Sequence, residues 1–426
     1  MVIFCRFDLD SGMDKRVLFL EAWRELYLYS KKDLERLILK RSVALDVSWQ
    51  RKIISFLTAF PYRIARFFYK KKFPQQPKKI LVIQWDYLGD IIVSTPALRT
   101  LRDIYSSAEI HLVTSPENKS YIDGFSFVNR MLYLKNPLHA GRGKFTLKDF
   151  FNCISKLRKE KYDFIIELTG RLPNQIFLPF LRTDYSVGLD PANNFYFLDR
   201  RVHSNRKHQT ERYLDAVNAV NKNNSNCSLE LWNPATEEDR LRINKLLQEK
   251  GIYNNFVIIH STASWKPRQW PIERWKKVLN FLTDKGGNVV FIGATEEYNQ
   301  IEQIRRLLKG KNNFNFAGLI SVRETIALME KADFFIGNDS GPMHLAAVAK
   351  LKAIVLFGPG DPIKWGYSFH KIIYKEPPCS PCPQFAFRDK CVKGLSICKG
   401  LLAITSDEVI EKCEEFLIDK KEEKNE

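Results

Sequence analysis

The sequence lacks a long apolar run. Its 426 residues are 45% hydrophobic and 27% charged, a composition typical of globular proteins. No stretch approaches the roughly 18–20 apolar residues that a membrane-spanning helix needs. The N-terminus also lacks the pattern of a secretory signal, because acids lie within the first ten residues and no apolar core leads to a small-residue cleavage site. We therefore expect a cytoplasmic protein without membrane spans.

Two nucleotide-binding signatures are missing as well. The chain contains neither G-x-G-x-x-G nor G-x-x-x-x-G-K-[ST]. These glycine-rich loops bind the pyrophosphate of a dinucleotide and the phosphates of ATP, respectively. The sequence therefore favours neither a dinucleotide-dependent enzyme nor a P-loop ATPase, and we predict no cofactor.

Cysteine is unevenly distributed. Four of the eight cysteines lie within twenty residues, at Cys379, Cys382, Cys391 and Cys398. Their spacing resembles half of a zinc ribbon, and four thiolates suit structural Zn²⁺. Reduced packing thiols and disulfides are the alternatives, and a cytoplasmic protein disfavours disulfides. The sequence leaves this choice open, and we predict no catalytic metal.

Positive charge is concentrated near the N-terminus. The net charge is +18, and residues 1–79 contribute 18 Lys and Arg against 8 Asp and Glu. Within this segment, residues 49–69 are aromatic and basic, and Pro61 interrupts their helical pattern. Residues 1–79 are either helices packed on the next domain or an interfacial helix on anionic lipid. The mildly basic remainder argues against a nucleic-acid-binding protein.

Two series of alternating strands and helices follow this extension. Short apolar runs predict three strands in the first series and four in the second, at 79–84, 109–114, 162–169, 256–260, 288–293, 332–337 and 352–358. A polar stretch at 218–234 separates the series as a candidate hinge. Strands that alternate with helices favour parallel sheets. We predict two Rossmann-like α/β domains facing a cleft.

The predicted domains have the following order. A helical extension, an N-terminal acceptor domain, a C-terminal nucleotide-sugar domain and a helix with a charged tail occupy residues 1–79, 80–225, 226–405 and 406–426. Capping boxes at Ser321 and Thr405 predict two helix starts, and the last helix is expected over 408–417.

The first candidate site segment is residues 84–102, which follow a predicted strand. Asp90 lies there in a Gly-Asp turn just before the helix expected over 91–105. A carboxylate in this position can accept the proton of a substrate hydroxyl. The alternative is that Asp90 is only the N-cap of the helix.

Two further segments follow strands of the second series. Residues 260–275 carry Lys266 and Arg268, which can neutralise a leaving diphosphate. In residues 334–347, a helix begins behind Asn338, Asp339, Ser340 and Gly341. Its free N–H groups suit an anion, and His344 lies about one turn into it. Solvated charges and an ordinary capped helix are the alternatives.

Together, the three segments and the following VLFGPGDPIKW resemble glycosyltransferase family 9, the ADP-heptose:lipopolysaccharide heptosyltransferases. The resemblance covers about residues 79–415. It implies a GT-B fold, inversion at the anomeric carbon and no metal requirement. By position, Asp90 matches the proposed catalytic base, and Asp339, Ser340, Gly341 and His344 match the donor-binding loop.

The resemblance leaves three points open. Arg268 stands where the family more often has Lys, so either Arg268 or Lys266 is expected to bind the diphosphate. The extension before residue 79 has no counterpart in the usual family body. The implied reaction transfers heptose from ADP-heptose to a lipopolysaccharide core or related glycolipid or oligosaccharide. Transfer of another nucleotide sugar, or nucleotide-sugar epimerisation on the same fold, is the alternative. A glycolipid acceptor implies contact with the inner membrane through residues 1–79.

Overall fold

The computed structural model describes residues 73–138, 146–181, 183–190, 197–220, 227–253, 255–308, 310, 312–379, 382 and 395–423. The predicted extension lies outside this part of the chain, except for residues 73–79. Those last residues pack on the first domain. The Phe73 ring lies edge-on to Phe164 and Tyr185, with centroid distances of 5.3 and 5.4 Å.

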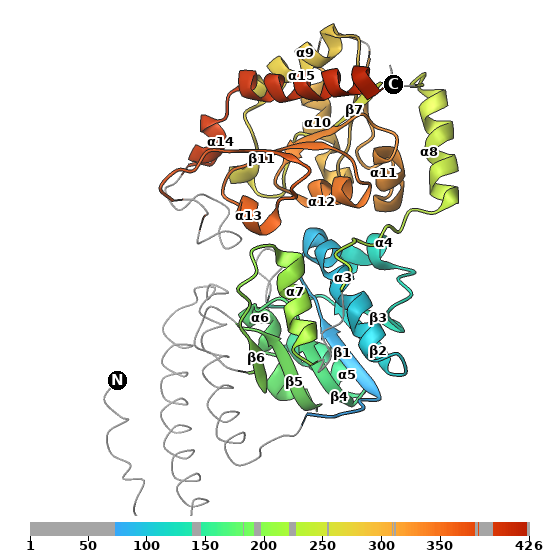
Figure 1. Ribbon diagram of the computed structural model, residues 1–426, viewed down its shortest axis with the longest axis vertical. Coiled ribbons are helices and arrows are strands. Elements are labelled where there is room, and N and C mark those ends of the chain that lie inside the picture. The colour runs from blue at the N-terminus through green and yellow to red at the C-terminus, as the bar shows by residue number, and fades with distance from the viewer. Residues whose placement is uncertain are drawn as a thin grey trace, which may run out of the picture. The chain divides into compact units, whose positions relative to one another are not determined.

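The first sheet has six strands, all parallel, in the order β3-β2-β1-β4-β5-β6. Their bounds are β1 Lys79–Ile83, β2 Glu109–Thr114, β3 Arg130–Tyr133, β4 Tyr162–Glu167, β5 Thr183–Leu189 and β6 Arg200–Val202. The helices are α3 Leu88–Ile104, α4 Lys119–Ile122, α5 Leu147–Arg158, α6 Leu172–Gln175 and α7 Gln209–Asn218. In Figure 1, α3 and α7 lie beside each other next to this sheet.

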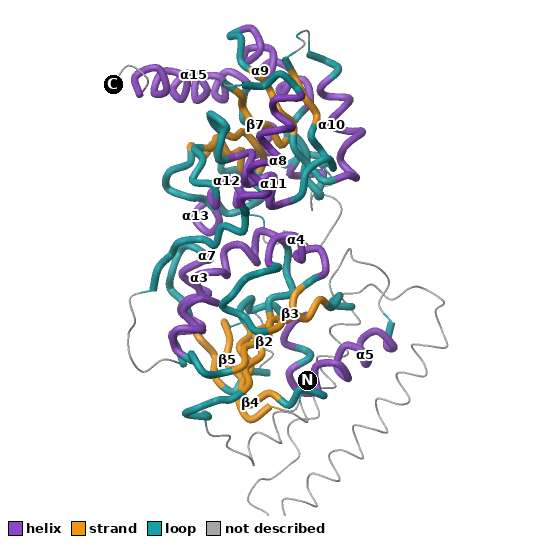
Figure 2. Tube along the Cα trace, turned by 90° about the vertical axis from the view of Figure 1, so that its right-hand side faces the viewer, coloured by secondary structure: helices purple, strands orange, loops and turns teal. Residues whose placement is uncertain are grey.

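The second sheet repeats this arrangement. Its order is β12-β11-β10-β7-β8-β9, again with six parallel strands. The strands are β7 Phe256–His260, β8 Asn288–Phe291, β9 Asn313–Asn315, β10 Phe335–Asn338, β11 Ala353–Phe357 and β12 Lys371–Tyr374. The helices are α8 Glu237–Glu249, α9 Ile272–Asp284, α10 Tyr298–Arg305, α11 Val322–Met329, α12 Gly341–Val348, α13 Pro362–Trp365, α14 Lys399–Ala403 and α15 Ser406–Glu423. Helices flank the strands of both sheets in Figure 2.

Both strand orders are those of a doubly wound fold. In each sheet the order reverses between the first and fourth strands along the chain, which are β1 and β4 in one and β7 and β10 in the other. Ligands of such sheets bind outside the carboxyl ends of the strands at this switch point. The fold therefore indicates two places at which site residues should gather.

The predicted strands are confirmed, and the helix starts need one correction. Strands rich in Ile and Val are buried on both faces, as continuous apolar runs predict. The capping boxes at Ser321 and Thr405 are present. However, α3 begins at Leu88 behind the N-cap Tyr87. Asp90 therefore lies inside the first turn, and the alternative that it is the N-cap is wrong.

Five strands escaped the sequence analysis, namely β3, β5, β6, β9 and β12. The edge strands are only three or four residues long, and their side chains are partly exposed. Short, mixed segments of this kind carry little periodic signal. The hinge expected over 218–234 lies partly outside the described residues, since 221–226 are not among them. The domain boundary at residues 225 and 226 stays a prediction.

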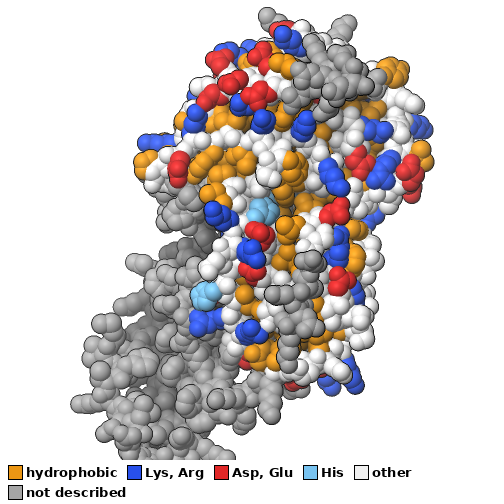
Figure 3. Space-filling model, viewed as in Figure 1, with side chains coloured by type: hydrophobic (Ala, Val, Ile, Leu, Met, Phe, Trp, Pro, Cys, Tyr) orange, Lys and Arg blue, Asp and Glu red, His pale blue; other side chains and the backbone are white. Residues whose placement is uncertain are grey.

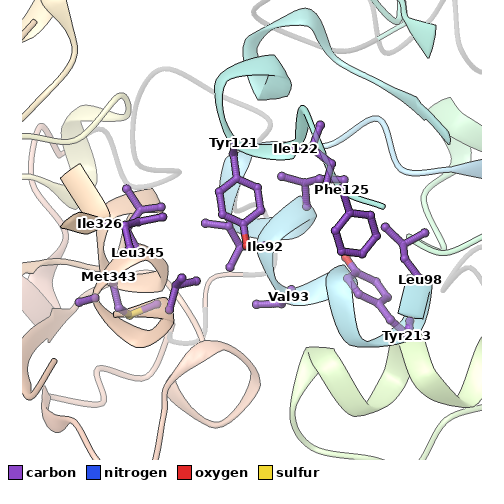
Figure 4. Packing of buried hydrophobic residues seen from close by; sticks show 14 of the residues in the cluster. Ile92, Val93, Leu98, Tyr121, Ile122, Phe125, Tyr213, Ile326, Met343 and Leu345 are labelled. Atoms are coloured by element: carbon purple, nitrogen blue, oxygen red, sulfur yellow. The ribbon is translucent and has the colours of Figure 1, made fainter. Parts of the chain in front are cut away.

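One hydrophobic cluster contains side chains from helices of both α/β domains. Ile92, Val93 and Tyr121 of α3 and α4 belong to the same buried cluster as Met343 and Leu345 of α12. Figure 4 shows these side chains directed toward one another. The Tyr121 hydroxyl also donates a hydrogen bond of 2.6 Å to the carbonyl of Trp232. The packing therefore places the start of α3 next to the start of α12.

Membrane-spanning helices are absent from the described residues, where every helix is too short or too polar to cross a bilayer.

Candidate functional site

Asp90 lies at the switch point of the first sheet. It occupies the first turn of α3, directly after β1, and is 7% exposed. The Tyr213 hydroxyl donates a 3.2 Å hydrogen bond to Asp90 Oδ1, and Arg171 Nη2 lies 3.9 Å from the same oxygen. Burial and then the charge of Asp86 raise the pKa of Asp90, against the opposing effect of Arg171. A carboxylate with a raised pKa is a stronger base.

Arg171 lies within ion-pair distance of both Asp86 and Asp90. Asp86 is fully buried, and its Oδ2 lies 3.1 Å from Arg171 Nε. Arg171 follows β4, the strand adjacent to β1. Burial lowers the pKa of Arg171, but the charges of Asp86 and Asp90 more than offset this and leave it raised. Sequence analysis missed both residues. The only signal for either is its position just after a strand.

Glu167 at the end of β4 holds the loop that carries Arg171. Its carboxylate accepts hydrogen bonds from the backbone N–H groups of Thr169 and Gly170 at 2.9 and 3.0 Å and from the Gln175 amide at 2.9 Å. Burial raises the pKa of Glu167 to about 7. Because these contacts fix the turn after β4, Glu167 serves the geometry of the site and not the reacting atoms.

Arg268 and Asp339 meet at the switch point of the second sheet. Arg268 ends a 3₁₀ turn after β7, and Asp339 follows β10. Arg268 Nη2 lies 3.6 Å from Asp339 Oδ2, whereas Lys266 is exposed. Burial raises the pKa of Asp339 and lowers that of Arg268, and the charges of Asp339 and Asp90 oppose the shift of Arg268. The structure therefore brings Arg268, and not Lys266, into the cluster.

The N-terminus of α12 is not capped by its N-cap side chain. Ser340 is the N-cap residue and makes no side-chain capping bond, which does not favour the alternative of an ordinary capped helix. Its hydroxyl instead donates to the Asn338 carbonyl at 3.2 Å and lies 3.2 Å from His260 Nδ1. Asn338 donates its side-chain amide to the Thr262 carbonyl at 3.2 Å. The first backbone N–H groups of α12 therefore donate no hydrogen bond to the Ser340 hydroxyl. Such N–H groups at a helix N-terminus can bind an anion.

His344 connects α12 to the Gly-Asp turn of α3. A Cβ on Gly89 would lie 2.6 Å from His344 Cδ2, so the imidazole packs directly on that glycine. His344 Nδ1 is hydrogen-bonded to the Tyr367 hydroxyl at 2.8 Å. Burial, followed by the nearby charges of His208, His370 and Arg268, lowers the pKa of His344 to about 3. His344 is therefore neutral near pH 7, and it packs on Gly89, the residue that precedes Asp90.

The cysteine cluster is only partly described. Cys379 and Cys382 are free thiols, Cys398 is buried, and Cys391 lies outside the described residues. No group of three metal-ligating side chains occurs in the described ranges. The state of the four-cysteine cluster stays open.

A buried carboxylate, a partly buried guanidinium and a helix N-terminus without a side-chain cap lie at the switch points of the two doubly wound sheets. Residues 150–387 match glycosyltransferase family 9 (heptosyltransferase), and the chain belongs to this family. It is 24% identical over 285 residues to lipopolysaccharide heptosyltransferase 3 of Escherichia coli, covering 65% of this chain and 82% of that protein. It is 27% identical over 334 residues to lipooligosaccharide heptosyltransferase 2 of Campylobacter jejuni, covering 74% and 94%.

Solved structures support the same fold. A glycosyl transferase of family 9 from Veillonella parvula superposes with a TM-score of 0.65 at 18% identity, covering 80% of this chain and 98% of that one. The E. coli ADP-heptose lps heptosyltransferase II superposes with a TM-score of 0.61 at 18% identity, covering 80% and 99%. The predicted GT-B fold is confirmed, and the chain is a glycosyltransferase.

Proposed function

We propose that this enzyme transfers heptose from ADP-heptose to a hydroxyl group of a lipopolysaccharide core or a related glycolipid. The observation that carries the proposal is the approach of Asp90 to the donor-side residues, because His344 packs on Gly89 and Arg268 interacts with the charge of Asp90. The names of the relatives supply the sugar and the acceptor: those proteins are lipopolysaccharide and lipooligosaccharide heptosyltransferases.

The proposed reaction inverts the anomeric carbon in one displacement. The Asp90 carboxylate accepts the proton of the acceptor hydroxyl, and the oxygen forms a bond to the anomeric carbon. The bond from that carbon to the diphosphate oxygen breaks, and ADP leaves with the electron pair. Arg268 and the N–H groups at the start of α12 stabilise the charge that develops on this diphosphate.

The donor contacts follow from the ends of β7 and β10. Asn338 and Ser340 hold the loop through His260 and the backbone after β7. Asp339 orients Arg268. A Cβ on Gly341 would meet only Leu88, at 3.6 Å, so the start of α12 leaves room for a phosphate. His344 faces the sugar from within α12.

A thermal-shift screen against ADP, UDP, GDP and CMP tests the donor. ADP should stabilise the protein selectively, because a ligand that binds only the native state at a hundred times its Kd adds about 2.7 kcal/mol. We expect Arg268→Gln to lose most of this shift and Lys266→Gln to lose little, since only Arg268 reaches Asp339. If UDP or GDP stabilises the protein more than ADP does, the donor is a UDP-sugar or a GDP-sugar and not ADP-heptose. If no nucleotide shifts the melting temperature, the proposal is contradicted.

Variants of Asp90 distinguish sugar transfer from epimerisation. Asp90→Asn should lower transfer from ADP-heptose by about 10²–10⁴-fold, because it removes the base. Its ADP-induced shift should persist. An epimerase needs no acceptor, so donor turnover that survives in Asp90→Ala without acceptor would favour that alternative.

We further propose that the enzyme works at the cytoplasmic face of the inner membrane, where a glycolipid acceptor would lie. The concentration of Lys and Arg in residues 1–79 supports contact with anionic lipid. By contrast, basic and acidic side chains are interspersed on the face drawn in Figure 3, which does not resemble a nucleic-acid-binding surface. Flotation of the full chain with anionic but not with neutral vesicles is the expected result. Equal flotation with both would contradict a charge-driven contact.

A further inference from the structure

Arg212 is a cation on α7 without an acidic partner among the described residues. It lies on α7 beside Tyr213, whose hydroxyl binds Asp90. Arg212 Nε is buried and has no hydrogen-bond partner, and no ion pair of Arg212 within 4.0 Å occurs among the described residues. The neighbouring Glu211 lies 3.9 Å from another cation, Arg206. The charge of Arg212 is therefore not neutralised within its own helix.

Lys364 is a second cation of this kind, and it belongs to the domain that contains the second sheet. It lies on α13, and its Nζ is 5.2 Å from the centroid of the Trp365 ring. That ring lies 6.0 Å from His344, which packs on Gly89. Asp361 accepts hydrogen bonds from the backbone N–H groups at the start of α13. Within the described ranges, Lys364 has no carboxylate within ion-pair distance.

Contacts between α7 and the segment after α13 bring the two cations together. His208, the N-cap of α7, lies with its ring 5.4 Å from that of Tyr367. Arg212 donates its backbone N–H to the His208 carbonyl at 3.2 Å, so the two residues share one face of α7. Tyr367 is three residues after Lys364. Burial and then the charge of Arg212 lower the pKa of Lys364, as expected for two like charges in the same region.

The other charges of the site already have partners. Asp86 lies 3.1 Å from Arg171, and Asp339 lies 3.6 Å from Arg268. Asp90 and then Asp361 oppose the lowering of the Lys364 pKa. Of these two acids, Asp361 already accepts the backbone N–H groups at the start of α13. Two partly buried cations beside one base carry an electrostatic cost that a bound anion would offset.

We propose that Arg212 and Lys364 form an anion subsite beside Asp90 that binds a phosphate or carboxylate group of the acceptor. The inference rests on the proposed function, because it assumes that Asp90 deprotonates the acceptor. The diphosphate of the donor is assigned to Arg268 and the start of α12. An anion held next to the base therefore belongs to the molecule whose hydroxyl reacts. This subsite would orient that hydroxyl toward Asp90.

Titration calorimetry with inorganic phosphate tests the subsite without turnover. Phosphate is titrated into the full-length protein in the presence of saturating ADP, which occupies the donor site. We expect one phosphate site in the unaltered protein. Its affinity should fall about tenfold in Arg212→Gln and in Lys364→Gln, because each variant removes one charge-assisted hydrogen bond. Lys250→Gln, which alters an exposed lysine after α8, is the matched control and should bind phosphate normally.

Three results would overturn the subsite. If the phosphate affinity is unchanged in both variants, Arg212 and Lys364 do not bind the phosphate. Phosphate that binds only without ADP would assign the anion to the donor's diphosphate. Reduced thermal stability of both variants without phosphate would indicate a structural role, since removing one of two like charges should not destabilise the protein. Failure of ADP to bind would instead contradict the proposed function and is measured separately.

Steady-state kinetics distinguish the source of the anion. With a truncated lipopolysaccharide as acceptor, both variants should raise the acceptor KM about tenfold and leave the ADP-heptose KM unchanged. Enzymatic removal of the acceptor's phosphates should raise the acceptor KM of the unaltered protein if a phosphate is bound, and leave it unchanged if a carboxylate is. An increase confined to the ADP-heptose KM would contradict an acceptor subsite.

Discussion

At the scale of single residues, the basicity of Asp90 depends on its neighbours. Burial and Asp86 disfavour its anion, whereas Arg171 and the Tyr213 hydroxyl stabilise it. The balance leaves the pKa raised, so that the carboxylate is a better proton acceptor than an exposed aspartate. Asp86 also anchors Arg171 at 3.1 Å. Asp86 therefore positions Arg171 and raises the pKa of Asp90, the proposed base.

Replacing Asp86 by asparagine should move the pH profile of the enzyme. In the proposed reaction Asp90 acts as the base in its anionic form, so the rate should rise as the pH increases through the pKa of Asp90. Asp86→Asn removes the negative charge that raises this pKa. The acid limb of kcat/KM should therefore shift to lower pH, and the plateau rate should fall because the base is weaker. The measurement is kcat/KM for the acceptor between pH 5 and 9.

An exposed carboxylate on α3 controls for the change in net charge. Asp103 is exposed near the end of α3, so Asp103→Asn should leave the acid limb in place. If the acid limb of Asp86→Asn coincides with that of the unaltered enzyme, Asp86 does not tune Asp90.

At the scale of elements, α3 and α12 meet through two glycines. His344 of α12 occupies the space above Gly89, and Leu88 of α3 lies beside Gly341. Each helix begins directly after a central strand of its own sheet. The contact therefore joins the two switch points, and glycine at position 89 is required by space and not by a left-handed backbone.

A methyl group at Gly89 should disturb this contact. In Gly89→Ala the new Cβ would lie 2.6 Å from His344 Cδ2, so the imidazole must move. Overpacking of this kind costs about 1–3 kcal/mol. We expect a lower free energy of unfolding and reduced transfer. Gly310→Ala is the control, because its Cβ would meet its nearest neighbour at an ordinary 3.7 Å.

A double mutant shows whether His344 is the cause. Gly89→Ala combined with His344→Ala should be less destabilised than the sum of the two single changes, because the clash is absent. Urea unfolding of the four proteins gives this coupling energy. Strict additivity would mean that the methyl group acts elsewhere.

At the scale of the whole molecule, buried histidines make folding sensitive to acid. His370 is 6% exposed, and burial lowers its pKa to about 4. His344 is affected in the same direction. Both lie in the region around Tyr367, where His208 also packs. The native state therefore keeps these rings neutral, although the unfolded chain would protonate them.

The stability of the protein should decrease as the pH falls below about 6.5, the ordinary pKa of histidine. Between about 6.5 and about 4, the unfolded chain binds a proton at His370 that the native state does not. Above that window His370 contributes no pH dependence. At pH 5 the contribution amounts to about 2 kcal/mol. His370→Gln should therefore reduce the loss of stability between pH 7 and 5 by about this amount.

Urea unfolding at a series of pH values measures the effect. His203→Gln is the control, since the His203 side chain is 79% exposed. The prediction concerns the slope with pH, so a uniform loss of stability in His370→Gln does not count against it. Equal slopes for His370→Gln and the unaltered protein would contradict it.

The sequence by itself determined the two α/β series, most central strands and the segments that carry the site. Continuous Ile and Val runs mark strands such as β1 and β7, which are buried on both faces. Local chemistry also marks the capping boxes at Ser321 and Thr405. These signals lie within a few residues of one another, so one sequence is sufficient to detect them. Asp90, Arg268 and Asp339 could be selected because each lies in the segment that follows such a strand.

Only the tertiary structure decided which of these residues lie together. Asp86 and Asp90 meet Arg171 because β1 pairs with β4, and Tyr213 reaches Asp90 across 123 positions of the chain. Arg268 was separated from Lys266 by the turn after β7, which directs one toward Asp339 and leaves the other exposed. The contact of His344 with Gly89 joins residues that follow different sheets. Strand order and helix packing create these distances, and no local pattern encodes them.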